Sequence, residues 1–391
     1  MAQGTTFDSI VLGVGAMGSA ALYHLARRGQ RVLGLERFAL GHDRGSSHGR
    51  TRVIRKAYFE HPDYVPLLHR AYELWDALAA ESGQALFDRT GLLLAGPPGD
   101  AVLAGVRRTA AQHGLAIEEL SAAERARRFP GLVCAPESEA LFERDAGYLR
   151  VEACVRAHAA LAERHGATLL TGAEVRAIHL DGAGVRVETA AGRFQAGSLV
   201  VSAGAYSAAL LPDLALPLVV RRKVQLWYDA APALHRDAGF PVFLVSDAAL
   251  GGIFYGFPAL DGADGEGLKV AEHSGGEAVP DPLQVDRGLR ADDEVRVRAF
   301  LQRHLPGVAR ARARRHEVCL YTMTPDEHFV LDRHPRHPQL VYAAGFSGHG
   351  FKFAAVVGEA LADLALRGQT ALPIDFLQAQ RFAVPLGTSA R

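Results

Sequence analysis

Two short apolar runs near the start of the chain flank a stretch of helical periodicity. The first run covers residues 9–12 and leads directly into a glycine-rich turn over residues 13–18. Residues 19–28 follow with apolar side chains at helical spacing, and the second run, 31–35, ends on Glu36. This order predicts a strand, a helix and a second strand, with a tight glycine turn between the first two.

A glycine turn in this position is the fingerprint of folds that bind dinucleotides. Gly13 allows the tight turn, Gly15 lets the backbone approach a pyrophosphate, and Gly18 lets the helix pack closely on the strands. The helix N-terminus offers N–H groups and partial positive charge to the phosphates. Glu36 can accept hydrogen bonds from ribose hydroxyls. We therefore predict a bound dinucleotide; the alternative is a glycine-rich turn without a ligand.

In the rest of the chain, segments with the helical period of 3.6 residues alternate with segments that have the strand period of two. Helical spacing, together with a capping-box pattern at Ser121 and Glu124, predicts further helices. They cover residues 61–83, 100–113, 121–129, 151–165, 292–304 and 353–367. A period of two predicts strands, and in one of them it places Lys269, Ala271 and His273 on one face. The strands cover residues 168–170, 174–180, 185–189, 193–195, 198–203, 218–228, 243–245, 253–257, 267–273, 318–322 and 340–344.

Composition excludes several classes of protein. Of 391 residues, 49% are apolar, and the 43 basic residues equal the 43 acidic ones, which argues against a general nucleic-acid binder. Three widely spaced cysteines fit neither a disulfide framework nor a zinc site, so no metal is expected. The fingerprint begins too early for a preceding signal peptide, and no apolar run is long enough to span a bilayer. We expect a cytoplasmic protein that does not bind membranes.

Two further segments carry candidate chemistry. Residues 41–52 are rich in glycine, small polar and basic residues, which fits either a solvated loop or contacts to a phosphate, a flavin ring or a substrate carboxylate. Near the C-terminus, the strand 340–344, the glycine-rich turn 345–352 and the helix 353–367 repeat the order seen at the start. This repetition predicts that the C-terminus returns to complete the nucleotide-binding domain.

On these residues the chain resembles the monomeric sarcosine oxidase and N-methyltryptophan oxidase family of flavoenzymes. The resemblance extends over nearly the whole chain and is most specific in two blocks, residues 319–329 and 345–353. It implies an α/β fold: a discontinuous, Rossmann-like FAD-binding domain of the glutathione-reductase type, and an α+β substrate domain whose large antiparallel sheet covers the flavin. The implied FAD-binding domain comprises residues 1–85, 150–217 and 325–391, and the substrate domain comprises 86–149 and 218–324.

The resemblance also implies which residues contact the cofactor. Cys319 would carry FAD through a thioether to the flavin 8-methyl group; without the resemblance, an inert buried cysteine would be the better interpretation. Arg52 and His48 match positions that support this attachment. The cofactor-binding residues implied are Gly13, Gly15, Gly18, Glu36, Ser46, His48, Cys319, Gly345, Gly348 and Gly350.

The substrate and oxygen sites are implied in the same way. Arg55 and Lys352 match the pair that binds the substrate carboxylate, and a guanidinium with a point cation suits that task. Lys269 matches the lysine that activates dioxygen above the flavin. Read alone, each would be an ordinary surface cation. The catalytic residues implied are Lys269, His273, Tyr321 and Arg52, and Tyr58, Tyr255 and Leu244 complete the substrate pocket.

Some positions depart from the family pattern. Relatives often have an acid where this chain has Arg50, a second histidine where it has Ser47, and a histidine where it has Lys56. These differences leave the flavin-binding residues intact and bear on the identity of the substrate.

The implied activity is the flavin-dependent oxidation of a secondary amine. An N-methyl amino acid such as sarcosine would be oxidised to an imine, which hydrolyses to the primary amine and formaldehyde while O2 is reduced to H2O2. N-methyltryptophan and pipecolate are alternative substrates. A flavin dehydrogenase, a nucleotide-binding protein without activity and an NAD enzyme are the alternative classes. The expected partners are the amino acid and O2, and a monomer is expected.

Overall fold

A computed structural model describes residues 5–182, 184–260 and 267–382. The chain forms two compact units, each assembled from separate segments. The first unit comprises Met1–Ser47, Val155–Arg221 and Tyr321–Arg391, and the second comprises His48–Cys154 and Arg222–Leu320. Three elements pass from one unit to the other: α5 (Val151–Arg164), β13 (Val219–Tyr228) and β18 (Ala313–Met323).

The unit boundaries differ from the domain boundaries expected from the sequence. Residues 48–85, which were expected in the FAD-binding domain, lie in the second unit. The ends of the expected FAD-binding domain, residues 1–4 and 383–391, lie outside the described residues. The assignment of the units as cofactor and substrate domains stays a prediction.

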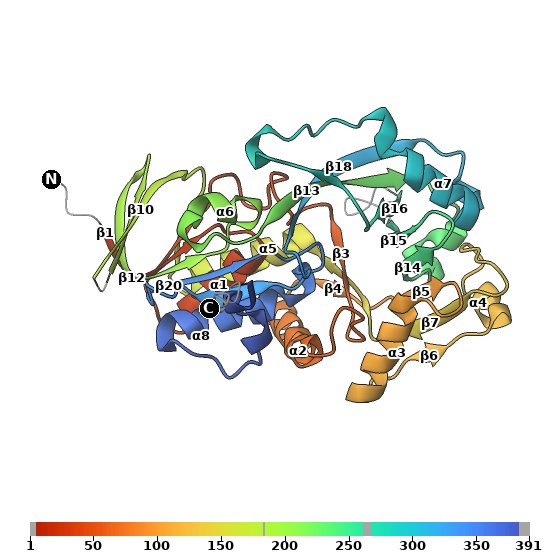
Figure 1. The fold of residues 1–391 in the computed structure, drawn as a ribbon, viewed down its shortest axis with the longest axis horizontal. Coiled ribbons are helices and arrows are strands. Elements are labelled where there is room, and N and C mark those ends of the chain that lie inside the picture. Colours follow the sequence, from red (N-terminus) through yellow and green to blue (C-terminus); the bar gives the residue numbers. More distant parts are fainter. Residues whose placement is uncertain (1–4, 183, 261–266, 383–391) are drawn as a thin grey trace, which may run out of the picture. The chain divides into compact units, whose positions relative to one another are not determined.

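The first unit is built on a largely parallel sheet (Figure 1). Its strand–helix–strand start is confirmed, and the neighbouring strands of its centre run parallel. In spatial order the central strands are β9 (Thr168–Leu170), β2 (Val32–Leu35), β1 (Thr5–Leu12), β12 (Gly192–Val201) and β20 (Leu340–Ala344). Antiparallel strands extend both β12 and β20. These are β10 (Val175–Asp181) and β11 (Gly184–Thr189) beside β12, and β19 (Val330–Arg333) beside β20.

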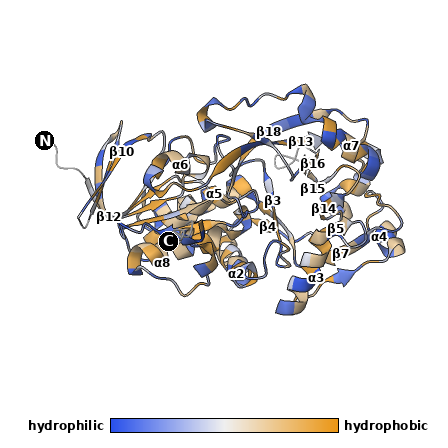
Figure 2. Cartoon of the chain, viewed as in Figure 1, coloured by the Kyte–Doolittle hydropathy of each residue, from blue (hydrophilic) through white to orange (hydrophobic). Residues whose placement is uncertain are grey.

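Two helices of this unit pack closely against each other. They are α1 (Ala16–Arg27) and α8 (Ala354–Arg367), and both are almost entirely buried. A Cβ atom added at Gly358 would lie 2.4 Å from Cβ of Ala20, so the glycine permits the close approach. Figure 2 shows the apolar character of α8. The first helix begins three residues earlier than expected, because Gly15 already serves as its N-cap.

The second unit contains the large, mostly antiparallel sheet that was expected. The sheet is antiparallel from β13 to β14 and from β5 to β6, whereas β14 and β5 run parallel. Its strand order is β17 (Glu277–Ala278), β13, β16 (Gly267–Glu272), β15 (Gly252–Leu260), β14 (Val242–Asp247), β5 (Leu92–Gly96), β7 (Glu139–Glu143) and β6 (Glu118–Glu119), with β18 paired to β13. A small sheet consists of β3 (Thr51–Ile54), β8 (Gly147–Arg150) and β4 (Phe87–Asp88).

The two faces of the large sheet have different roles. One face packs against α7 (Val295–His304), where Phe300 stacks on Phe254 with ring centroids 4.6 Å apart. The strand register places Leu244 opposite Tyr255, and Phe257 opposite Lys269, on the other face. Helix α7 therefore covers one face, and the other carries residues predicted to form the site.

The remaining helices lie close to their predicted positions. They are α2 (Tyr64–Ser82), α3 (Ala101–His113) and α4 (Ala122–Arg128), and α4 begins with the expected capping box. The short α6 (Ser207–Leu210) was not predicted. Several boundaries were wrong. Residues 193–195 and 198–203 form one strand, β12; α2 and α7 each begin three residues later than predicted; and β15 and β18 are longer than predicted. Among the described residues, no helix has both the length and the apolar character needed to cross a membrane.

Candidate active site

The glycine fingerprint of the first unit leaves no room for side chains. Gly13 has a φ of +83°, and a Cβ atom at Gly13 would lie 2.8 Å from the carbonyl oxygen of Ser202. A Cβ atom at Gly18 would lie only 1.8 Å from the carbonyl oxygen of Gly13. The Ser202 hydroxyl donates to that same oxygen at 2.9 Å, which ties the turn to the end of β12.

Replacing Gly18 with alanine should disrupt this turn. The new methyl group would collide with backbone, which cannot move aside as a flexible side chain can, so we expect a loss of about 1–3 kcal/mol in the free energy of unfolding. We also expect weaker FAD binding. Urea denaturation and FAD titration measure the two effects. Gly307→Ala is the control, because nothing lies within 4 Å of its added Cβ atom; equal stability of both variants would contradict the prediction.

Glu36 is buried at the end of β2 and organises the turn after β1. One carboxylate oxygen accepts a hydrogen bond from the backbone N–H of Val14 at 2.8 Å, and the other accepts from the backbone N–H of Phe38 at 2.9 Å. His42 lies 3.3 Å from that second oxygen. Burial by itself would raise the pKa of the Glu36 carboxyl, but the hydrogen bonds from His42 and the backbone outweigh it and lower the pKa. The carboxylate is therefore charged.

Ser47 lies at the N-terminus of α1, which the sequence did not predict. Its hydroxyl oxygen accepts a hydrogen bond from the backbone N–H of Ala16 at 3.0 Å and would lie 3.3 Å from a Cβ atom at Gly15. The predicted cofactor residue Ser46, beside it, is exposed. The only signal in the sequence was the departure from the family pattern at position 47.

The glycines of the C-terminal block pack closely against neighbouring side chains, and Gly348 packs against the Tyr321 ring. Gly345 and Gly348 have φ values of +64° and +80°. A Cβ atom at Gly348 would lie 2.2 Å from the Tyr321 ring, and one at Gly350 would lie 2.5 Å from the ring of Phe346. These glycines are therefore needed for close packing of the turn.

Lys352 is buried just before α8. Its side chain is almost fully covered, and Nζ donates a 2.6 Å hydrogen bond to the carbonyl oxygen of His349. The residue is therefore not the surface cation that its sequence position alone would indicate.

Lys269 is the most deeply enclosed cation among the predicted site residues of the second unit. Its side chain is 2% exposed. Nζ donates to the carbonyl oxygens of Gly49 at 2.7 Å and of Thr51 at 3.0 Å, with the Thr51 hydroxyl at 3.4 Å. Nζ also lies 4.8 Å from the ring centroid of Phe257 and 5.2 Å from that of Trp227. Oxygen acceptors and ring faces together suit a positive charge.

Two effects oppose each other at this amine. Burial lowers the pKa of Lys269 well below its usual value, and the nearby charge of Arg52 lowers it further. Glu317 and Glu152 raise the pKa and offset part of this effect. The protonation state of Lys269 is thus set by its neighbours and is sensitive to added charge.

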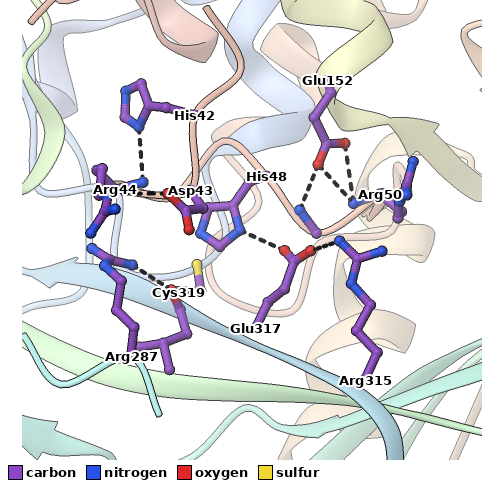
Figure 3. Close-up of polar contacts among 12 residues, drawn as sticks. His42, Asp43, Arg44, His48, Arg50, Glu152, Arg287, Arg315, Glu317 and Cys319 are labelled. Carbon is purple, nitrogen blue, oxygen red and sulfur yellow. Dashed lines mark hydrogen bonds and ion pairs between the residues drawn. The ribbon is translucent and has the colours of Figure 1, made fainter. Parts of the chain in front are cut away.

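The turn that faces Lys269 is held by a carboxylate. Gly49 and Arg50 both have left-handed backbone, with φ values of +87° and +68°. Glu152 accepts hydrogen bonds from the backbone N–H of Gly49 at 2.8 Å and of Arg50 at 3.1 Å (Figure 3). Glu152 was missed in the sequence, because it lies about a hundred residues away in the first turn of α5.

His48 forms a buried pair with Glu317, another residue that the sequence did not reveal. Their atoms Nδ1 and Oε2 are 2.7 Å apart, and Arg315 contacts the other oxygen of the carboxylate (Figure 3). Burial acts to raise the pKa of Glu317, but His48, Arg315 and Lys269 lower it to about 2. Glu317 lies two residues before Cys319, so a strand drawn back beyond residue 318 would have placed both on one face.

Cys319 is buried next to a guanidinium. Its side chain is 1% exposed, and Nη2 of Arg52 lies 3.4 Å from Sγ. Nη1 of Arg52 donates to the carbonyl oxygen of Thr51 at 2.9 Å, which fixes the guanidinium. The sulfur of Cys319 therefore lies in an electropositive environment.

Arg55 holds a carboxylate within the second unit. Its Nη2 lies 2.7 Å from both carboxylate oxygens of Glu60, and Nη1 donates to the carbonyl oxygen of Ala57 at 2.8 Å. The guanidinium lies 4.3 Å from the ring centroid of Tyr58. Glu143 supports the same loop by accepting from the backbone N–H of Ala57 at 3.2 Å. The group predicted to bind a substrate carboxylate therefore binds a side-chain carboxylate here.

The predicted pocket residues of the large sheet share one face. Leu244, Tyr255 and Ala271 lie opposite one another on adjacent strands. His273 follows β16 by one residue, and its ring lies 6.3 Å from that of Tyr255. Gln225 lies opposite Ala271, and neither polar atom of its buried amide has a hydrogen-bond partner among the described residues.

The predicted site residues divide between the two units. The first unit brings together its fingerprint glycines, and separately the C-terminal block; its residues are Gly13, Gly15, Gly18, Glu36, Ser46, Tyr321, Gly345, Gly348, Gly350 and Lys352. The second unit brings together Lys269, Arg52 and Cys319, and holds His48, Arg55, Tyr58, Leu244, Tyr255 and His273. Within the described ranges, no cluster of three potential metal ligands occurs.

Comparison with known proteins identifies the family. The model of the family described as "FAD dependent oxidoreductase" matches residues 8–364. The chain belongs to this family. It is 44% identical to a monomeric sarcosine oxidase of Streptomyces avermitilis, over 97% of this chain and 98% of the relative. It is 37% identical to an N-methyl-L-tryptophan oxidase of Citrobacter koseri, over 96% and 99%.

A solved structure agrees with the fold. The open form of NikD, an unusual amino acid oxidase, superposes with a TM-score of 0.84 at 27% identity, covering 96% of this chain and 97% of that chain. The family membership makes FAD the cofactor of this oxidoreductase. The residues of the first unit fit FAD, because the fingerprint glycines keep the turn free of side chains and the charged Glu36 lies beside it.

Proposed function

We propose that the enzyme oxidises the N-methyl group of a small secondary amino acid and passes the electrons to dioxygen. The observation that carries this proposal is the buried guanidinium of Arg55, which donates hydrogen bonds to the carboxylate of Glu60. A buried arginine with both oxygens of a carboxylate in reach is the geometry that recognises an amino-acid carboxylate. The similarity to a monomeric sarcosine oxidase over nearly the whole chain supports the same substrate class.

The site residues divide the work between binding and oxygen chemistry. FAD, when bound, accepts a hydride equivalent from the N-methyl carbon and transfers two electrons to O2. Arg55 and Lys352 hold the substrate carboxylate, which fixes the position of the N-methyl group. His273 and Tyr321 lie around the amine, and the amine enters unprotonated because its lone pair must be available.

The remaining pocket residues are apolar or aromatic. Tyr58, Tyr255 and Leu244 line the substrate pocket, and their buried positions support that role. Lys269 stabilises the negative charge that develops on dioxygen. The imine product is hydrolysed by water to the primary amine and formaldehyde.

An aerobic assay with sarcosine tests the proposed reaction. We expect equal amounts of formaldehyde and H2O2, with N-methyltryptophan and pipecolate as comparison substrates. Formaldehyde without H2O2, and turnover that needs an added electron acceptor, would instead identify a flavin dehydrogenase. No turnover of any secondary amine would reject the proposal.

We also propose that FAD is covalently bound through a thioether to Cys319. The buried sulfur beside the Arg52 guanidinium supports this link. After acid precipitation, the flavin absorbance of the wild-type protein should stay in the pellet, and that of Cys319→Ala should move entirely to the supernatant. Cys154→Ala is the control, because Cys154 is equally buried but its thiol contacts only the carbonyl oxygen of Leu86 among the hydrogen bonds described. Release of wild-type flavin would exclude the thioether.

The oligomeric state and location follow as further proposals. The relatives named monomeric sarcosine oxidase support a monomer, and gel filtration should give a mass near 41.9 kDa. A cytoplasmic location stays a prediction from the sequence.

A further inference from the structure

We propose that Glu317 is a positioning residue for covalent flavin attachment: it orients His48 so that this imidazole removes the proton from the Cys319 thiol. This inference rests on the proposed thioether at Cys319. It assigns a further function to a buried carboxylate that also raises the pKa of Lys269.

Glu317 determines the orientation of the His48 imidazole. Glu317 carries its charge, because the neighbouring cations keep the pKa of its carboxyl at about 2. A charged carboxylate can only accept, so the proton of the 2.7 Å contact belongs to Nδ1 of His48. In the neutral form of the imidazole, this hydrogen bond leaves the lone pair on Nε2, on the other side of the ring. Since His48 is 2% exposed, this orientation is fixed by Glu317 rather than by water.

The carboxylate of Glu317 has a fixed position. Arg315 holds the second oxygen of Glu317 from the opposite side (Figure 3). The side chain of Glu317 is only 13% exposed. With both oxygens engaged and little solvent access, the carboxylate has one orientation in which to hold the imidazole.

Glu317 and His48 lie on the same side of β18 as the Cys319 thiol. Glu317 and Cys319 are two residues apart on β18, so their side chains lie on the same face of the strand. Figure 3 shows the sulfur of Cys319 pointing toward the His48 ring. Nη2 of Arg52 lies 3.4 Å from the same sulfur. A thiol, an imidazole and an orienting carboxylate form the arrangement that activates cysteine nucleophiles.

The attachment reaction balances as follows. The S–H proton passes to Nε2 of His48, a proton leaves the flavin 8-methyl group, and a bond forms between Sγ and that carbon. The C–H electron pair remains on the ring system, so the attached flavin is reduced by two electrons. Dioxygen, the oxidant of the proposed reaction, removes these electrons and becomes H2O2. His48 then returns its proton to the solvent.

Measuring attachment separately from binding tests this inference. Full-length protein is produced under riboflavin limitation and mixed with saturating FAD, and the covalent fraction is followed by the flavin fluorescence of the denatured chain on a gel. For Glu317→Gln we expect attachment about 100-fold slower than in wild type, which is the lower end of the range for loss of a positioned base. The dissociation constant for FAD should stay near the wild-type value. Glu317→Asp keeps a carboxylate and should retain most of the rate.

Asp293→Asn is the matched control. Asp293 is as buried as Glu317 and is also paired with an arginine, Arg222, but it has no contact with His48 in the hydrogen bonds described. It should attach FAD at the wild-type rate. His48→Asn should be as slow as Glu317→Gln, which provides a second route if the glutamine variant does not fold.

The possible outcomes distinguish failure of the proposed role of Glu317 from failure of the proposed thioether at Cys319. Wild-type protein that binds FAD without any covalent fraction would overturn both the thioether and the role of Glu317. Wild-type attachment together with a normal saturating rate in Glu317→Gln or His48→Asn would overturn the role of Glu317 alone. A change confined to the FAD dissociation constant would also overturn it, because Glu317 would then have a purely structural role.

Discussion

Lys269→Met should slow the oxidation of reduced flavin by O2 by about 10²–10³-fold, the range observed when one preorganised electrostatic group is removed. The reduction of the flavin by substrate should change little. Methionine fills a similar volume but cannot stabilise the negative charge on dioxygen. Anaerobic reduction followed by mixing with oxygenated buffer, with flavin absorbance as the signal, separates the two half-reactions. Equal effects on both would reject the assigned role.

Lys223→Met is a matched control for this experiment. Lys223 is also a buried lysine of the second unit, and its Nζ donates to the carbonyl oxygen of Ser274 at 2.6 Å. It belongs to the support of a loop rather than to the predicted oxygen site. Its replacement should therefore leave the rate of reoxidation close to wild type, even if the free energy of unfolding falls.

The same lysine predicts a pH dependence. Only the ammonium form of Lys269 carries charge, so the rate of reoxidation should be high below its pKa and fall as the pH rises through it. Burial and Arg52 lower that pKa from its usual value, so the fall should come at a lower pH than for an exposed lysine. In Lys269→Met this fall should disappear. A wild-type rate with the same pH dependence as Lys269→Met would contradict the assignment.

Arg55→Met should lower kcat/KM for sarcosine by about 30- to 5,000-fold. Removing one partner of a buried charge pair costs about 2–5 kcal/mol, because the other charge is left unpaired. Here the unpaired charge is the substrate carboxylate, or Glu60 before substrate binds. Steady-state kinetics with sarcosine and with an uncharged secondary amine, such as N-methylpropylamine, measures the effect. The uncharged amine should lose far less.

Glu60→Gln tests the opposite side of the same pair. Without Glu60 the Arg55 guanidinium has no carboxylate among its described partners, so the free protein should lose about 1–3 kcal/mol of stability. A substrate carboxylate would then meet less competition, and KM should fall. A raised KM would mean that Glu60 supports substrate binding instead of competing with it. Thermal unfolding measures the loss of stability, and its dependence on added acetate measures carboxylate binding at Arg55 independently of the kinetics.

Local spacing alone predicted much of the fold. The strand, glycine turn, helix and second strand at the start depend on residues that are near one another in sequence, and the backbone positions of Gly13 and Gly18 follow from that order. Helices and strands elsewhere could be predicted from the spacing of apolar residues, because an element with one buried face has apolar residues at the period of that element. The errors lay at boundaries, as at α7 and β18, where pairing and capping rather than period decide the end.

By itself the sequence determined the two periodic patterns and the glycine fingerprint, because these depend on neighbours a few residues away. Only the tertiary structure decided which distant groups meet. His48 contacts Glu317 across 269 positions, and Lys269 contacts the carbonyl oxygen of Gly49 across 220. No local pattern records such a pairing, since burial of charge is stable only when the folded chain brings a partner to it.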